Sequence, residues 1–322
     1  MKKVVAGIDI GGTNTAIGLV DQDARCLDQA VIPTAKFDKV EDFVPAVRAE
    51  IDRMVSAPLT LVGIGIGAPN GNYYHGTIEH APNLKWRGII PLVEMFQKFY
   101  TVPVALTNDA NAAAIGEGVF GSARNFRHFI VITLGTGVGS GIVVNGELLY
   151  GHDGFAGEIG HTIVDPNGRE CGCGRRGCLE TYASAGGIKR TVFELLATKN
   201  TPSVLRSTSF DTLTAKQIAD AARAGDAIAR EAFEHTGKIL GLKLADAVAH
   251  LSPEAIILFG GLAQAGDLIF EPTQRWMETY MLNIFKNKVK LLPSGLSGEN
   301  TAILGAAALI WNEIKRTVGT PA

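Results

Sequence analysis

A pattern of strand, glycine turn and strand occurs twice in the chain, and it restricts the fold more than any other feature. The first copy is GIDIGGTNTAIGLVDQDARCL, and it contains the first glycine turn at Gly11–Thr13. The second copy is IVITLGTGVGSGIVVNGELLYG at 130–151, with the second glycine turn at Gly135–Gly137. In both copies a buried strand meets the turn, a second strand follows, and a polar turn leads to a further short strand. Two matched copies predict a duplicated architecture, with the turns facing each other across a cleft.

The two glycine turns also suggest phosphate binding. The Walker A loop and the dinucleotide fingerprint both lead from a strand into a helix, whereas each turn here leads into another strand. Backbone N–H groups in such a turn can still point at a phosphate and form an anion-binding nest. The alternative for a single turn is an ordinary hairpin, and this alternative stays open for each turn taken alone.

Length and composition fit a protein of two lobes that binds neither nucleic acid nor an anionic membrane. The chain has 322 residues, 46% of them apolar and 19% charged, which is typical of a soluble globular protein. A net charge of −2 provides no basic surface for nucleic acid or an anionic membrane. The first apolar run is too short for a signal peptide, and none approaches the roughly 20 residues of a membrane span. We therefore expect a cytoplasmic protein with neither nucleic-acid nor membrane partners.

A cluster of cysteines in the segment 154–184 predicts a metal site. Cys171, Cys173 and Cys178 follow His161, and two carboxylates, Glu158 and Glu180, flank the set. Three thiolates and an imidazole complete the tetrahedral coordination of a structural zinc ion. In a reducing compartment, clustered cysteines favour metal binding over disulfides. The alternative is an incidental cluster with a surface histidine.

Further polar and glycine residues stand at predicted strand ends. Asp9 ends the strand at 4–10, and Asn108 and Asp109 end the strand at 102–109, just before a helical run. Asp109 has two interpretations, as the N-cap of that helix or as a catalytic base facing a cleft. Gly260-Gly261 follows a strand within 253–266, where it could admit an adenosine or form a tight turn.

Helical periodicity defines the remaining elements. It is strongest over 38–55, 91–100, 184–198, 214–250 and the final apolar segment NTAILGAAALIWNEIK. No low-complexity linker separates two domains, so we expect short crossings near 108 and before 300. The predicted lobes are a smaller one from 1–107 plus 300–322 and a larger one from 108–299, which carries the zinc loop.

Five motifs in this order, GIDIGGTN, LTNDANAAA, LGTGVGSG, GEIGHTIV and CGCGRRGCLE, resemble the ROK family of sugar kinases and regulators. This family belongs to the actin/hexokinase/Hsp70-like ATPase superfamily. The resemblance covers nearly the whole chain, and the cysteine loop is its most specific part. It implies an α/β fold of the two-lobed actin-like ATPase (ribonuclease H-like) type, with a duplicated mixed-sheet domain and a central cleft.

The resemblance also implies a role for each site residue. Asp109 matches the catalytic base, which takes the proton of the attacking sugar hydroxyl. The positions that match sugar-binding residues are Asn83, Asn108, Asp109, Glu158, His161 and Glu180. The zinc ligands would be His161, Cys171, Cys173 and Cys178. The positions that match the nucleotide site are Asp9, near Mg²⁺, then Gly11, Gly12, Thr13, Gly135, Thr136 and Gly137 in the phosphate loops, and Gly260 and Gly261 in the adenosine loop.

The implied function is ATP-dependent phosphorylation of a hexose at its 6-hydroxyl, with glucose as the first candidate. Such transfer depends on positioning and charge neutralisation, which the turns and Mg²⁺ can supply. Fructose, mannose, allose, N-acetylhexosamines and a polyphosphate donor stay open as alternatives. A sugar-responsive regulator would carry an N-terminal winged-helix domain, for which the first glycine turn at residue 11 leaves no room. A sugar-binding protein without catalysis is a third possibility, and a homodimer is expected from the family.

Overall fold

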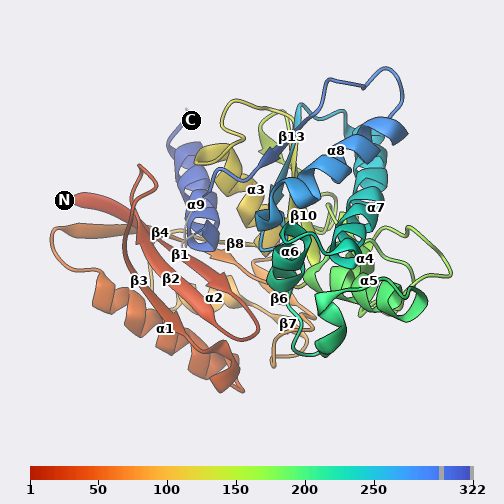
Figure 1. The fold of residues 1–322 in the computed structure, drawn as a ribbon. Coiled ribbons are helices and arrows are strands. Elements are labelled where there is room, and N and C mark those ends of the chain that lie inside the picture. The colour runs from red at the N-terminus through yellow and green to blue at the C-terminus, as the bar shows by residue number, and fades with distance from the viewer. Residues whose placement is uncertain (297–300, 320–322) are drawn as a thin grey trace. The chain divides into compact units, whose positions relative to one another are not determined.

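The computed structural model describes residues 1–296 and 301–319, with side chains up to 316 in the last segment (Figure 1). The chain divides into two compact units. The first comprises 1–126, 141–156 and the segment from 294 onward, and the second comprises 127–140 and 157–293.

Two five-stranded sheets have the same topology. The first contains β1 (Lys2–Ile10), β2 (Thr15–Val20), β3 (Cys26–Ile32), β4 (Leu59–Gly67) and β8 (Val104–Thr107), in the order β3-β2-β1-β4-β8. The second contains β9 (Phe129–Leu134), β10 (Val138–Val144), β11 (Glu147–Leu148), β12 (Ala255–Phe259) and β13 (Lys290–Pro293), in the order β11-β10-β9-β12-β13. In both sheets, the strand that comes first in the sequence lies in the middle, and the next two strands in the sequence lie on one side of it. The predicted duplication of a mixed sheet is therefore confirmed.

The connections of the first sheet explain its mixed directions. Short turns join β1, β2 and β3, which pair antiparallel. The strands β4 and β8 pair parallel to β1 and to each other, so they need longer crossovers. One crossover contains α1 (Val40–Met54), and the other contains α2 (Leu92–Gln97) and a small sheet that the sequence patterns do not predict: β5 (Gly71–Asn72), β6 (Thr77–Glu79) and β7 (Ile89–Ile90).

Successive side chains of β1 point to opposite faces of the first sheet, and each face has a buried core. Val4, Ala6, Ile8 and Ile10 belong to one buried cluster with the apolar residues of α1. The opposite face is covered by α9 (Thr301–Gly319), which packs unusually close to the strands. A Cβ on Gly65 would lie 1.9 Å from the carbonyl oxygen of Ala306, so only glycine fits at this contact.

The helix α3 (Asp109–Val119) is part of the first unit because it packs against α9. A Cβ on Gly305 would lie 2.7 Å from the carbonyl oxygen of Ala112, and one on Gly116 would lie 3.0 Å from the Cα of Gly305. The compact units are thus divided differently from the predicted lobes, 1–107 with 300–322 and 108–299, which placed α3 in the larger lobe.

The second unit is rich in helices. Its helices are α4 (Glu180–Ala183), α5 (Ala185–Thr198), α6 (Ala215–Arg223), α7 (Ala227–Leu251) and α8 (Asp267–Tyr280). The short 3-10 helices of the chain are η1 (Thr34–Lys36), η2 (Ile159–His161), η3 (Val204–Ser207) and η4 (Ala263–Ala265). The predicted helical segment 214–250 is two helices, because a turn with Gly225 at a φ of +97° separates α6 from α7. The side chains of Thr214 and Asp226 cap the starts of these helices. Among the described residues, no helix combines the length and apolar character that a bilayer crossing requires.

Candidate functional site

The parallel strands of the first unit bring two carboxylates to one edge of the sheet. In the strand register, Asp9 of β1 pairs with Gly67 of β4, and Gly67 pairs with Thr107 of β8. A Cβ on Gly67 would lie 3.7 Å from Oδ1 of Asp9 and 3.8 Å from the Cα of Asp109. The glycine therefore leaves space between the two acidic residues at the carboxyl ends of the strands, where ligands of α/β sheets bind.

Burial raises the pKa of both carboxylates. Burial, and secondarily the negative charge of Asp109, raises the pKa of Asp9 to about 6. Removal from water also raises the pKa of Asp109, against the opposing effect of N–H donors that include the backbone of Ala110. Carboxylate oxygens are the ligands that Mg²⁺ prefers, so a nearby magnesium ion fits this pair.

The start of α3 corrects one interpretation of Asp109. The N-cap is Asn108, whose backbone is extended and whose Oδ1 accepts a hydrogen bond of 2.6 Å from the backbone N–H of Asn111. Asp109 is the first helical residue, so the hypothesis that it is the N-cap was wrong by one position. Its Oδ1 accepts a hydrogen bond of 2.8 Å from the backbone N–H of Ala110, and its role as a catalytic base stays a prediction.

The first glycine turn lies against Asn83. The backbone N–H of Gly11 donates to the carbonyl oxygen of Asn14 over 3.0 Å and closes the turn, while Thr13 at its tip is exposed. A Cβ on Gly12 would lie 2.5 Å from the carbonyl oxygen of Asn83. The turn and Asn83, which are far apart in the sequence, are therefore direct neighbours.

In the second unit, the second glycine turn lies beside the paired glycines. The backbone N–H of Gly135 donates to the carbonyl oxygen of Gly137 over 3.0 Å. Gly260 has a φ of +101°, and a Cβ there would lie 2.7 Å from the carbonyl oxygen of Leu134, so glycine is required on both grounds. Around Gly261 the space is open. The turn and the pair thus form one glycine-rich surface at the end of β9, which suits a nucleotide.

Glu158 and His161 are positioned by contacts of η2 with β10. The Ser140 hydroxyl donates to the carbonyl oxygen of Gly157 and accepts from the backbone N–H of Ile159 over 3.2 Å. A Cβ on Gly160 would lie 1.9 Å from the carbonyl oxygen of Val138. The 3-10 helix is therefore fixed against the strand that follows the second glycine turn.

The four predicted metal ligands converge on one point. The ligand atoms of His161, Cys171, Cys173 and Cys178 all lie within 4.8 Å of one another. The distance is 3.8 Å from Cys171 Sγ to His161 Nδ1 and 3.6 Å from Cys173 Sγ to Cys178 Sγ. A tetrahedral zinc ion with Zn–S bonds of about 2.3 Å separates its sulfur ligands by about 3.8 Å, so the residues fit zinc.

Two features of this cluster bear on its chemistry. His161 turns its Nδ1 toward the thiols, so its Nε2 is available for another partner. Burial acts to raise the pKa of the Cys173 thiol, but hydrogen bonds from Arg175 and the neighbouring thiols outweigh it and lower this pKa to about 6. A cysteine with this pKa is largely thiolate at neutral pH, which is the form that binds zinc.

Glu180 connects the metal cluster with the second glycine turn. Its Oε2 accepts a hydrogen bond of 3.0 Å from the backbone N–H of Val138, and its Oε1 lies 3.8 Å from Cys171 Sγ. The family resemblance implies only a sugar contact for Glu180, and nothing in the sequence indicates its bond to Val138. Ser140 is likewise not predictable, because a hydroxyl that binds only main-chain atoms has no signal in a single sequence.

The two sheets of equal topology, each with a glycine turn between its first two strands, define the actin-like ATPase fold. Its ROK branch is identified by the match of the ROK family model to residues 5–313. The chain belongs to the ROK family.

Relatives of two kinds match the chain. A glucokinase of Halalkalibacterium halodurans is 36% identical over 311 residues, which cover 94% of each chain. A xylose repressor of Bacillus spizizenii is 34% identical over 260 residues, which cover 81% of this chain and 64% of the repressor. The crystal structure of a ROK family glucokinase from Streptomyces griseus, in complex with glucose and AMPPNP, superposes with a TM-score of 0.80 at 34% identity and covers 95% of this chain and 98% of that one.

Proposed function

We propose that the chain is an ATP-dependent hexose kinase that converts glucose to glucose 6-phosphate, with Asp109 as the base. The observation that carries this proposal is the exposed Asp109 at the first position of α3, where it and Asp9 border the same space at Gly67. The similarity to glucokinases over nearly the full length of both chains supports the choice of sugar.

In this mechanism Asp109 accepts the proton of the 6-hydroxyl as its oxygen attacks the γ-phosphate of ATP. The proton is transferred late in a loose transition state, so a base with a nearly ordinary pKa is sufficient. The glycine turns direct backbone N–H groups at the phosphates. Bound Mg²⁺ would neutralise charge on the phosphate oxygens, and Asp9 is the residue that would hold it.

Sugar recognition falls to side chains with oriented donors and acceptors. The side-chain oxygen of Asn108, Oδ1, caps α3. The side-chain N–H₂ group is therefore left to donate to a sugar hydroxyl. His161 would donate from Nε2 if zinc holds Nδ1. Asn83, Glu158 and Glu180 complete the proposed set. A wrong epimer would leave such groups unpaired, which gives strong discrimination.

The zinc ion has a structural role in this proposal. Its four protein ligands occupy every position of a tetrahedral site, so no position remains for substrate or water. When bound, the metal fixes the loop that carries His161 and precedes Glu180.

The main alternatives are a kinase for another hexose, a polyphosphate donor and a sugar-responsive regulator. The match to a xylose repressor favours the last of these over an unrelated function. A regulator needs to bind sugar but has no need of a base, so turnover separates the two. The homodimer and the cytoplasmic location stay predictions.

The deciding experiment measures ADP release with ATP over glucose, mannose, fructose, allose and N-acetylhexosamines, and repeats the best sugar with polyphosphate. We expect the highest kcat/KM for glucose with ATP. Sugar binding without turnover of any hexose would exclude the kinase and leave the regulator.

A further inference from the structure

Arg169 lies in the loop between the metal ligands His161 and Cys171, and its side chain is only 10% exposed. A buried guanidinium is costly unless its donors are satisfied. Here all five N–H donors have acceptors. Nε donates to Glu194 Oε1 (2.9 Å), one terminal nitrogen donates to the carbonyl oxygens of Thr181 (2.7 Å) and Gly187 (3.0 Å), and the other donates to Thr191 Oγ1 (2.9 Å) and Glu194 Oε2 (2.5 Å).

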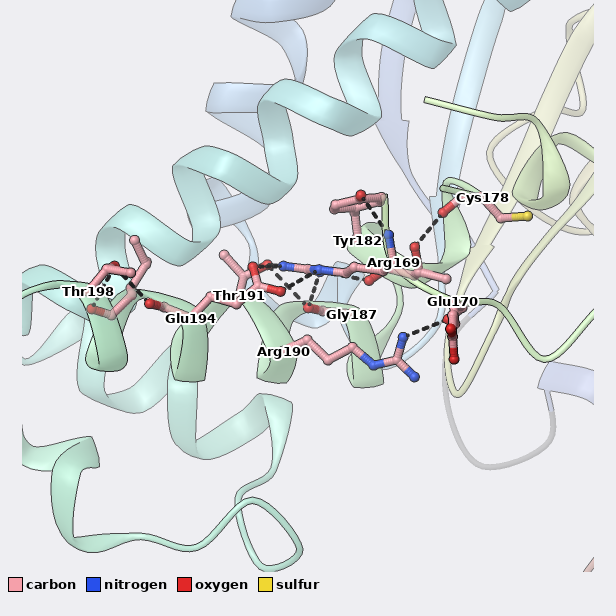
Figure 2. A network of polar contacts seen from close by, with 11 residues as sticks. Arg169, Glu170, Cys178, Tyr182, Gly187, Arg190, Thr191, Glu194 and Thr198 are labelled. Carbon is pink, nitrogen blue, oxygen red and sulfur yellow. Dashed lines mark hydrogen bonds and ion pairs between the residues drawn. The ribbon is translucent and has the colours of Figure 1, made fainter. Parts of the chain in front are cut away.

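An aromatic ring completes this arrangement. The guanidinium carbon of Arg169 lies 4.4 Å from the centre of the Tyr182 ring, and the backbone N–H of Arg169 donates to the Tyr182 hydroxyl over 3.3 Å. Figure 2 shows the guanidinium extended from the loop among Tyr182, Gly187, Thr191 and Glu194. One arginine thus joins the metal loop to α4 and to the first three turns of α5.

The contacts reach the part of the second unit that handles phosphate and sugar. Thr181 directly follows Glu180 in α4, and Glu180 accepts from the backbone N–H of Val138, next to the second glycine turn. The backbone N–H of Ala185, at the start of α5, donates to the carbonyl oxygen of Gly135 over 2.9 Å. A shift of α4 would therefore move Glu180 and loosen both bonds to this turn.

The geometry points to Arg169 as a positioning residue for substrate binding. It holds α4 so that Glu180 faces the sugar and orders the second glycine turn for the nucleotide. This function does not require the metal, because none of the five acceptors of Arg169 is a metal ligand. The inference rests on the proposed function, and it deepens it by adding a second, metal-independent support for Glu180.

The loss of Arg169 should leave the fold intact. Glu194, which forms the ion pair with Arg169, is 58% exposed and stays hydrated when the arginine is removed. Arg169→Ala should raise the Kd for glucose and the Kd for AMPPNP about tenfold each, since small misplacements of positioned groups are costly. Arg169→Lys should recover little, because a lysine cannot reach four residues with a planar fork of donors.

Arg190→Ala is the matched control. Arg190 lies on α5, at the same junction, and donates from an exposed side chain to the carbonyl oxygen of Glu170 over 3.0 Å (Figure 2). It should leave both Kd values unchanged. Guanidinium ion at millimolar concentration should restore binding to Arg169→Ala and have no such effect on Arg190→Ala, which a general loss of stability would not produce.

The experiment measures both Kd values by calorimetry, bound zinc per chain, the melting temperature and the KM and kcat of each variant. The inference holds if both Kd and KM values rise while zinc content stays at the wild-type level. It is overturned if Arg169→Ala only melts earlier with unchanged Kd values, or if added zinc restores binding. Wild-type turnover tests the proposed function separately. If the wild type phosphorylates glucose and the Arg169 variants have unchanged Kd values, only the inference is overturned.

Discussion

The carboxylate of Glu180 and the backbone N–H of Val138 are joined by a hydrogen bond of 3.0 Å. Glu180 therefore connects the two proposed substrate sites. The side chain that is proposed to contact the sugar also holds the end of the second glycine turn, which is proposed to bind the phosphates of ATP. The space for this bond exists only because residue 137 is a glycine: a Cβ there would lie 2.4 Å from Oε2 of Glu180.

Gly137→Ala should weaken binding of ATP and of glucose with little loss of stability. The new methyl group would displace the end of a flexible side chain rather than backbone, so the free energy of unfolding should fall by less than about 1 kcal/mol. Both KM values should rise because Glu180 leaves Val138. Gly186→Ala in α5 is the control, because a Cβ there would meet only Ser184 Oγ at 3.8 Å, an ordinary van der Waals contact. Unchanged KM values in Gly137→Ala would show that the bond has no functional role.

Cys173→Ser, or removal of zinc by a chelator, should lower stability and glucose affinity together. Losing a structural metal ligand belongs to the severe class of substitutions, and we expect a loss on the order of 4 kcal/mol in unfolding free energy. Affinity should fall because His161 and Glu180 lose their support. Calorimetric titration with glucose and thermal melting check this. Cys26→Ser, a change in β3, serves as the control, and normal glucose affinity in metal-free folded protein would refute the coupling.

Asp9→Asn should stabilise the magnesium-free protein at neutral and alkaline pH while impairing turnover. The pKa of Asp9 is raised from 3.8 to about 6, so the folded state binds this proton more tightly than the unfolded state does. Unfolding free energy therefore falls as the pH rises between these two values and stays lowered above the upper one. Because Asp9 is partly exposed, we expect a gain of about 1–2 kcal/mol in the variant.

Urea unfolding of wild type and Asp9→Asn on both sides of that pH window, without Mg²⁺, gives the test. The two proteins should differ at about pH 8 and converge at about pH 3, below both values. A variant that is less stable than wild type at the higher pH would contradict the assigned pKa shift. The KM for MgATP should rise in the variant, since Asp9 is proposed to hold the metal.

Sequence patterns predicted the fold where local chemistry and tertiary structure agree. The repeated strand–turn–strand copies and the helix predicted at 38–55 follow hydrophobic period and turn residues, so the sequence was sufficient to predict them. The small sheet β5-β6-β7 was missed because strands of two or three residues have no period to detect. The N-cap was placed one residue late, since Asn108 and Asp109 are both good caps and only backbone geometry distinguishes them.

The candidate site was predictable in part for a similar reason. Cysteines and a histidine at ligand spacing have few other roles, and the structure does bring them together. The functions of Ser140, Arg169 and Gly137 depend on which backbone atoms lie opposite them. Such contacts arise from the packing of distant segments, and a single serine, arginine or glycine in a sequence carries no sign of them.

The most direct test of the proposed function compares wild type with Asp109→Asn, using kcat for glucose with MgATP and the Kd for glucose. The amide keeps the shape of the side chain but cannot accept the proton, so kcat should fall by about 10²–10⁴-fold while glucose binding is largely retained. Asp23→Asn, an exposed change in the turn before β3, should leave both values at the wild-type level. Near-normal turnover by Asp109→Asn would contradict the account.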